Sequence, residues 1–297
     1  MIRVLLLACC ALGLAAESFP TQRAIDYLVR EVPRWSKENA CFSCHNNGDG
    51  ARALYVAEQY GYRIPTVALA DTTRWLSAPA DWDRNRVNPA FSDKKLARIQ
   101  FSAALAQAYD SAIIRDRSAL MAAAQSLIPY QEPDGSWQVD AGSAVGSPVT
   151  YGTALSTYFA RRTLEMAGFT EPAKRAKQWL TESKPHSILD AAALLLALPT
   201  RRDCLDMILR AQASDGGWGP HAMSAAEPFD TAVVLLSLRN LDQPRSVARG
   251  RAFLIARQRP DGGWPETTRP PGAQSYAQHI STSAWATLAL VLTDSER

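Results

Sequence analysis

The 297-residue chain has little of several features that would place it in a class at once. Its charge is nearly balanced, with 32 Lys+Arg against 29 Asp+Glu and no basic stripe, which argues against a nucleic-acid partner. No apolar run reaches the roughly 18 residues that a transmembrane span needs. Of the five cysteines, only Cys41, Cys44 and Cys204 lie beyond residue 16, too few for a disulfide scaffold of this length. The 16 glycines and 18 prolines exclude fibrous and low-complexity classes. A folded globular chain remains.

The first 16 residues have the pattern of a secretory signal peptide. Met1–Arg3 is a short positive start, residues 4–16 are apolar and uncharged, and the small residues Ala15 and Ala16 precede Glu17. We expect residues 1–16 to be removed, residues 17–297 to form a single domain, and the protein to be exported, either periplasmic or secreted. A lipoprotein site at Cys9 is the weaker alternative, because too little apolar sequence precedes it.

A seven-residue motif, Gln-x-x-Asp-Gly-[Ser/Gly]-Trp, occurs three times with identical internal spacing. The copies are Gln131–Trp137, Gln212–Trp218 and Gln258–Trp264. The Asp-Gly pair predicts a tight turn with positive φ, and the Gln can both donate to and accept from backbone groups at a helix end. The Trp can cover the turn with a large apolar face. These properties indicate a structural staple in a repeat protein, not a catalyst.

Each motif separates an amphipathic helix from a uniformly apolar one, which predicts an outer helix, a turn and an inner helix per unit. The outer helices are expected at Pro20–Val32, Thr66–Ser77, Ser118–Tyr130, Glu171–Ser183, Asp203–Ala211 and Ser246–Arg257, and the inner ones at Gly50–Tyr60, Lys94–Tyr109, Thr153–Ala160, Ile188–Leu198, Thr231–Leu238 and Ser283–Leu292. Six helical hairpins predict an all-α fold, an (α/α)6 toroid, with an open solenoid as the alternative. Segments 78–93 and 138–148 are expected to be loops at the mouth.

The Gln-Trp repeats, over about residues 118–292, resemble those of the squalene–hopene cyclase and protein prenyltransferase superfamily. The resemblance implies a terpenoid cyclase-like closed toroid, with a central cavity that could hold an apolar small molecule. The family's catalytic acid motif, Asp-x-Asp-Asp-Thr-Ala, is matched only by Glu227–Ala232, where Phe229 replaces the proton donor. Asp230 remains as a weak catalytic candidate or a helix N-cap. The prenyltransferase zinc ligands have no counterpart on an inner helix, so no zinc is expected.

Cys41-Phe42-Ser43-Cys44-His45 reads C-x-x-C-H, the attachment signature of c-type haem. Two thiols at this spacing can bond the two vinyl groups of one porphyrin, and His45 can then be the proximal iron ligand. A Cys41–Cys44 disulfide is an alternative, and a zinc site would need a fourth ligand that is not evident.

The other three histidines also fall just before or at the start of inner helices. If the ring closes, His279 in the sixth hairpin adjoins the first, which makes it the first candidate for the distal iron ligand. His221 or Met223 is the next candidate, and His186 lies at the equivalent position of the fourth hairpin. Each could equally be an ordinary histidine at the rim of the ring.

Three functions follow from these patterns. The leading hypothesis is an exported toroid with covalent haem c, acting in redox chemistry or electron transfer with a redox partner protein. The second is a haem-free isoprenoid- or terpenoid-binding protein, or a squalene-cyclase-like protein without the cyclase acid. The third is a non-catalytic interaction scaffold.

Overall fold

The computed structural model describes residues 3–84, 94–139, 151–266 and 275–294. Helices dominate these ranges, and no strand forms within them. The outer helices are α1 (Arg3–Asn39), α3 (Thr66–Leu76), α5 (Arg117–Leu127), α7 (Thr170–Glu182), α9 (Arg202–Arg210) and α11 (Pro244–Arg257). The inner helices are α2 (Ala51–Gln59), α4 (Lys94–Asp110), α6 (Gly152–Ala167), α8 (Ile188–Ala197), α10 (Pro228–Leu238) and α12 (Tyr276–Leu292).

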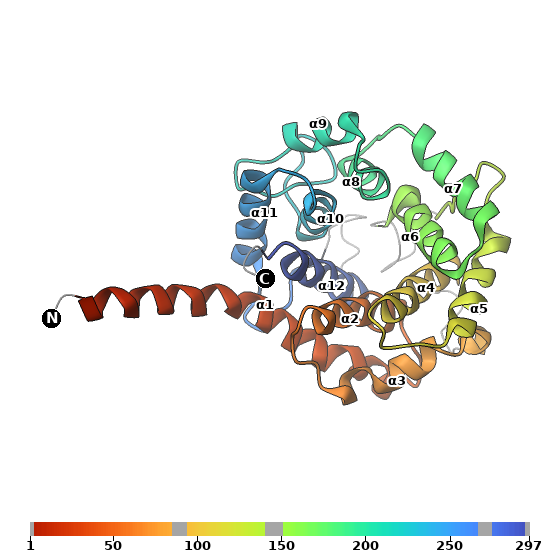
Figure 1. Ribbon diagram of the computed structural model, residues 1–297, viewed down its shortest axis with the longest axis horizontal. Helices are drawn as coiled ribbons and strands as arrows, with labels where there is room; N and C mark the ends of the chain where they lie inside the picture. The colour runs from red at the N-terminus through yellow and green to blue at the C-terminus, as the bar shows by residue number, and fades with distance from the viewer. Residues whose placement is uncertain (1–2, 85–93, 140–150, 267–274, 295–297) are drawn as a thin grey trace.

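The six inner helices form a closed ring inside the outer ones. Each inner helix packs on the next, and α12 returns to pack on both α1 and α2 (Figure 1). Their side chains are buried almost all round, whereas α7 and α9 bury one stripe, as the sequence pattern predicted. The (α/α)6 toroid is therefore confirmed and the open solenoid is wrong. The N-terminal part of α1 projects away from the ring (Figure 1).

The first two Gln-Trp motifs staple one unit to the next. The Nε2 of Gln131 donates to Pro172 O in α7, and the Nε2 of Gln212 donates to Ser246 O in α11. The indole of Trp218 is fully buried, and its Nε1 donates to Ile208 O of the preceding outer helix at 2.8 Å. Each motif thus connects its own outer helix, its inner helix and the next outer helix, which confirms the structural interpretation.

The third motif makes the same connection to α1, which closes the ring. The Nε2 of Gln258 donates to Pro20 O at 2.9 Å, and Arg23 donates back to the Gln258 side chain at 2.6 Å. Gly262 adopts φ 98°, and a Cβ placed on it would lie 2.2 Å from Arg23 O. Only glycine allows both the left-handed backbone and this approach.

Three element boundaries differ from the sequence predictions. The helix α1 continues past Pro33 to Asn39, so the missing N–H of Pro33 does not end it. A buried π-helical segment, η1 (Cys44–Gly50), leads into α2, so the first inner element begins before Gly50. The helix α12 starts at Tyr276 instead of Ser283, because buried polar residues such as Gln278 and Thr282 break the apolar pattern but not the helix.

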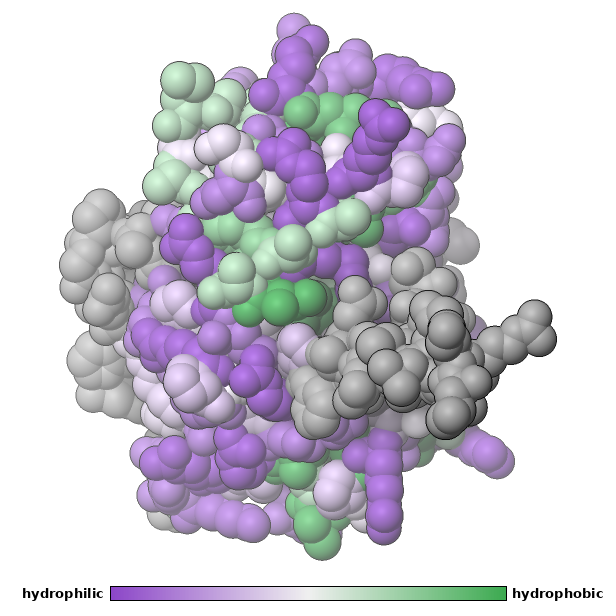
Figure 2. Space-filling view, turned by 90° about the vertical axis from the view of Figure 1, so that its left-hand side faces the viewer, coloured by the Kyte–Doolittle hydropathy of each residue, from purple (hydrophilic) through white to green (hydrophobic). Residues whose placement is uncertain are grey.

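The expected mouth loops are only partly described. Part of the first forms a short 3-10 helix, η2 (Pro79–Arg84), and residues 85–93 and 140–150 lie outside the described residues. The outer face on the side of α9 and α11 is mainly hydrophilic (Figure 2). No helix among the described residues has both the length and the apolar character needed to cross a membrane.

Candidate functional site

The C-x-x-C-H segment lies between α1 and the inner ring. Ser43 caps η1, its hydroxyl accepting from the backbone N–H groups of His45 and Asn46. The two asparagines that follow are buried: Asn46 donates to Tyr276 of α12, and Asn47 donates to Thr72 of α3. The first unit therefore makes its inter-unit joint with asparagines instead of a Gln-Trp motif.

The side chains expected to hold haem lie close together in sequence but face different neighbours. Trp35 Nε1 donates to the buried Cys41 Sγ at 3.3 Å, and Cys44 Sγ lies 3.6 Å from His45 Nε2. No disulfide joins Cys41 to Cys44 among the described residues. Burial lowers the pKa of His45, although the Asp49 charge opposes this shift, so the imidazole is favoured in its neutral, metal-binding form.

The candidate distal ligands are spread along the same end of the inner helices. On α12, His279 lies one turn beyond Tyr276, and its Nε2 is 3.5 Å from the hydroxyl of Tyr27 of α1. Burial and the Arg259 charge lower the pKa of His279. His186 and His221 are exposed, and Met223 is 98% exposed. Of these, the structure brings only His279 into the sixth-to-first unit junction; its role as an iron ligand stays a prediction.

Cys204 stands apart from this segment. It is a reduced, fully buried thiol on α9, and burial raises its pKa to about 11. These properties are typical of a structural cysteine.

A buried acid, which the sequence analysis did not single out, lies at the centre of the ring. Asp49 is 1% exposed, and its Oδ2 accepts from Gln100 Nε2 at 2.8 Å and from Ser281 Oγ at 2.6 Å. These donors come from α4 and α12, so three inner elements meet at one carboxylate. Burial and the Asp49 charge raise the pKa of Tyr151 well above its usual range. The available signal was Gly48-Asp49-Gly50 at the head of an inner helix.

One turn further along, Arg52 is 4% exposed and lies between two aromatic rings. Its Cζ is 4.4 Å from the centre of the Phe159 ring and 4.2 Å from that of Trp285. Its nearest carboxylate contact joins NH2 to Asp49 Oδ1 at 3.6 Å, too long for a hydrogen bond. Its Nε and NH2 have no hydrogen-bond partner among the described residues. The guanidinium is therefore held mainly by cation–π contacts.

Four aromatic side chains gather around this arginine. Tyr151, Phe159 and Phe229 each contact Trp285 at ring-centre distances of 5.6–5.8 Å and with steep interplanar angles. We call these four residues the aromatic cluster. Tyr276 lies apart from this cluster: it stacks on Trp35 at 5.3 Å, and its hydroxyl donates to Glu31.

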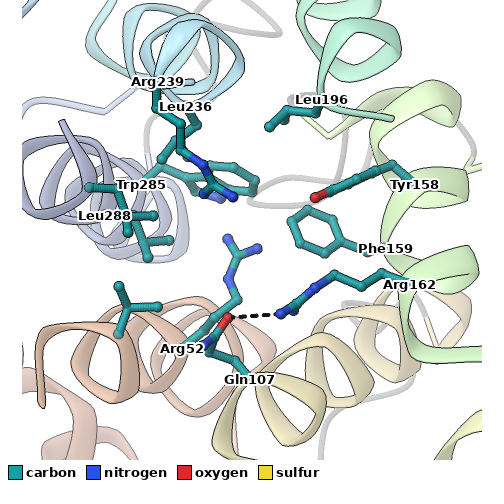
Figure 3. A pocket seen from close by; sticks show the side chains of 12 residues that line it. Arg52, Gln107, Tyr158, Phe159, Arg162, Leu196, Leu236, Arg239, Trp285 and Leu288 are labelled. Carbon is teal, nitrogen blue, oxygen red and sulfur yellow. Dashed lines mark hydrogen bonds between the residues drawn. The ribbon is translucent and has the colours of Figure 1, made fainter. Parts of the chain in front are cut away.

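The ring centre opens to a pocket at the end where the inner helices finish (Figure 3). The cavity holds about 80 Å³, and its walls include Tyr158, Phe159 and Trp285 together with leucines from α8, α10 and α12. Figure 3 shows the side chains of Arg52, Arg162 and Arg239 directed into it.

Asp230 does not act as the helix N-cap. The N-cap of α10 is Glu227, and Asp230 lies in the first turn, fully buried. It does not line the pocket. Asp49 does not line it either, but its charge raises the pKa of Tyr151 in the aromatic cluster.

No protein-family model matches the chain. The chain is 29% identical over 173 residues to drimenyl diphosphate synthase of Streptantibioticus cattleyicolor. This alignment covers 50% of this chain and 32% of that protein. It therefore spans about a third of the length of the curated relative that it matches.

Solved structures share the fold at low sequence identity. The type II terpene cyclase MstE from Scytonema matches with TM-score 0.60 and 14% identity, over 93% of this chain and 97% of that one. An MstE variant bound to the substrate geranylgeranyl dihydroxybenzoate matches with TM-score 0.60 and 13% identity, over 94% and 98%. A glycosidase variant matches with TM-score 0.61 and 12% identity, over 95% and 97%. The chain has a terpene cyclase-like α/α toroid, a fold that also occurs in a glycosidase.

Proposed function

We propose that this protein binds an isoprenoid-type ligand, an apolar chain with double bonds, at the ring centre and does not cyclise it. The observation that carries the proposal is the aromatic cluster, which meets the pocket through Phe159 and Trp285. Aromatic faces and leucines suit the methyl groups and double bonds of such a chain. The sequence similarity to drimenyl diphosphate synthase, a terpenoid enzyme by name, supports this choice over a sugar ligand.

Binding without cyclisation follows from the position of Arg52. Cyclisation started by protonation places a carbocation beside aromatic rings, and here those ring faces already hold a permanent cation. A second positive charge nearby would be repelled in a site of low dielectric constant. Asp49 is also held by two donors, as expected for a structural carboxylate.

The cavity is smaller than the roughly 300–1,000 Å³ of typical ligand pockets. A bound chain therefore requires side chains at the mouth to move. Arg239 is exposed and Tyr158 is half-buried, so both can change rotamer at little cost in packing. The apolar tail would then follow the leucines of the mouth.

The test uses farnesyl diphosphate as the probe, with tryptophan fluorescence to follow binding and mass spectrometry of extracted products to follow chemistry. We expect saturable quenching with the probe recovered unchanged. The Trp285→Leu variant should weaken binding about 10-fold or more, because it removes an aromatic wall. Trp179→Leu is the matched control, since Trp179 lies on α7 outside the pocket.

Absence of saturable binding would overturn the proposal. Cyclised products would overturn the claim that the ligand is not cyclised. If those products were then lost in Asp49→Asn but not in Asp230→Asn, Asp49 would be the catalytic acid.

A second candidate function is covalent attachment of haem c. It is supported by the C-x-x-C-H donor set, by a His45 Nδ1 that has no hydrogen-bond partner among the described residues, and by an adjacent surface pocket of about 560 Å³. Phe42, stacked on Trp75 at 4.5 Å, lines that pocket, and Lys37 and Arg74 could pair with propionates. Neither sulfur lines it, so attachment requires the 41–45 segment to turn outward.

If haem attaches, protein exported in a host with cytochrome c maturation will show a Soret band and a haem stain that survives denaturation. Both signals should vanish in Cys41→Ala and Cys44→Ala, while Cys204→Ala retains them. A colourless wild-type protein under these conditions rules this candidate out.

A further inference from the structure

The pocket at the carboxyl ends of the inner helices carries an excess of positive charge. Arginines make up three of its twelve lining residues, Arg52, Arg162 and Arg239, and none of the twelve is acidic. They come from α2, from α6 and from the end of α10, so the toroid brings together charges that are far apart in the chain (Figure 3). Gathering like charges in a concave site costs free energy unless an anion offsets it.

Helix capping does not explain these arginines. The backbone carbonyls at the ends of α8 and α12 are capped by other residues: Arg161 donates to Ala197 O, and Arg251 donates to Leu290 O. Arg239 forms no ion pair among the described residues, and Arg162 pairs with Asp110 at 3.0 Å. The three guanidiniums of the pocket are therefore additional to those that stabilise the helix ends.

The buried polar groups of this pocket that lack partners are all donors. The Nε and NH2 groups of Arg52, which is 4% exposed, have no hydrogen-bond partner among the described residues. The indole N–H of Trp285 also lacks one there. A buried donor without an acceptor costs about 1–3 kcal/mol, so an acceptor-rich ligand would gain by entering. Water could satisfy the donors, but it would leave Arg239 without a counter-ion among the described residues.

We propose that this pocket is an anion-binding site that takes a phosphoryl group, with Arg52 at its base and Arg162 and Arg239 at its mouth. Planar guanidiniums pair with phosphate oxygens in bidentate fashion, and three of them suit a diphosphate better than a single carboxylate. The proposal deepens the proposed function, because the phosphoryl group could be the head of a prenyl diphosphate. Free inorganic diphosphate is the other source with the same chemistry.

The anion would share Arg52 with Asp49. Since Arg52 NH2 lies 3.6 Å from Asp49 Oδ1 without a hydrogen bond, the guanidinium can turn toward an incoming phosphoryl oxygen and keep its stacking between the rings. Asp49 retains its bonds from Gln100 and Ser281 when this happens.

The test is calorimetric titration of the full chain with inorganic diphosphate. We expect one site per chain and a loss of affinity of about 10-fold or more in Arg239→Ala, since each charge-assisted hydrogen bond contributes substantially. Arg239 is exposed, so its removal leaves the fold intact. Arg63→Ala is the matched control, an exposed arginine outside the pocket, and should bind as the wild type does. No binding at millimolar diphosphate, or equal losses in both variants, overturns the proposal.

A competition arm separates the two sources. If farnesyl diphosphate displaces inorganic diphosphate and farnesol does not, the site holds the head group of an isoprenoid ligand. If inorganic diphosphate binds and the prenyl compound fails to compete, the anion site stands and the proposed function fails. If farnesyl diphosphate binds with unchanged affinity in Arg239→Ala and inorganic diphosphate does not bind, the anion site is overturned while the proposed function stands.

Discussion

Replacing Gly262 with alanine should lower the free energy of unfolding by about 3 kcal/mol or more. Two costs combine. The backbone at φ 98° is strained for any residue with a Cβ, which accounts for about 1–2 kcal/mol. The new Cβ would also lie 2.2 Å from Arg23 O, so α1 must move away from the motif and the Gln258–Pro20 hydrogen bond must stretch.

Two glycines serve as references for this prediction, which urea denaturation can check. Gly168 has φ 90° at the end of α6 but only a flexible arginine terminus nearby, so Gly168→Ala should cost about 1 kcal/mol. Gly216 lies against Arg249 O as Gly262 lies against Arg23 O, so Gly216→Ala should cost as much as Gly262→Ala. A Gly262→Ala cost near that of Gly168→Ala would show that α1 is not held by the third motif in solution.

Removing the carboxylate of Asp49 should lower the free energy of unfolding at least as much as Gly262→Ala does. We expect Asp49→Ala to cost about 3–5 kcal/mol, because it leaves Arg52 as an uncompensated buried charge and strips the acceptor from Gln100 and Ser281. Asp49→Asn also removes the negative charge beside Arg52, but it keeps an acceptor oxygen and the side-chain shape, so its cost should be smaller than that of Asp49→Ala by about 1 kcal/mol or more.

A double-mutant cycle isolates the charge term. Arg52→Met keeps an unbranched side chain that extends toward Phe159 and Trp285, while removing the cation. The pair Asp49→Ala and Arg52→Met should cost less than the sum of the two single variants, by about 1–3 kcal/mol. Strict additivity in denaturation curves would mean that Arg52 and Asp49 do not stabilise each other.

The fold could be predicted because many of the connections between neighbouring helical hairpins, here called joints, have a local sequence signature. The Gln-Trp spacing repeats at three of the six joints, and the alternation between amphipathic and apolar helices supplies the rest. The first joint has no such signature, since Asn46 and Asn47 act through a π-helical turn whose hydrogen-bond partners lie on α1, α3 and α12. No local pattern in the sequence encodes those partners.

The site was harder to predict because its residues are distant in sequence. Arg52, Arg162 and Arg239 each look like an ordinary polar residue of a helix, and only the closed ring shows that they share a pocket. The family's acid motif matches the start of α10, whereas Asp49 lies in η1 and has no such motif around it. The C-x-x-C-H motif is local and can be read directly from the sequence, but the role of Cys41, Cys44 and His45 in holding haem stays a prediction.

The joint between α11 and α1 differs from the other five in one respect: the polypeptide does not continue across it. Elsewhere a connecting segment supports the motif, whereas here the two sides are joined only by non-covalent contacts. These are the hydrogen bonds of Gln258, Arg23 and Arg30 between the outer helices and the packing of α12 on α1 and α2. A stretching force applied between residues 20 and 294 would therefore act directly on these non-covalent contacts. The ring should open first between α11 and α1, which would leave the six hairpins as an open, linear array.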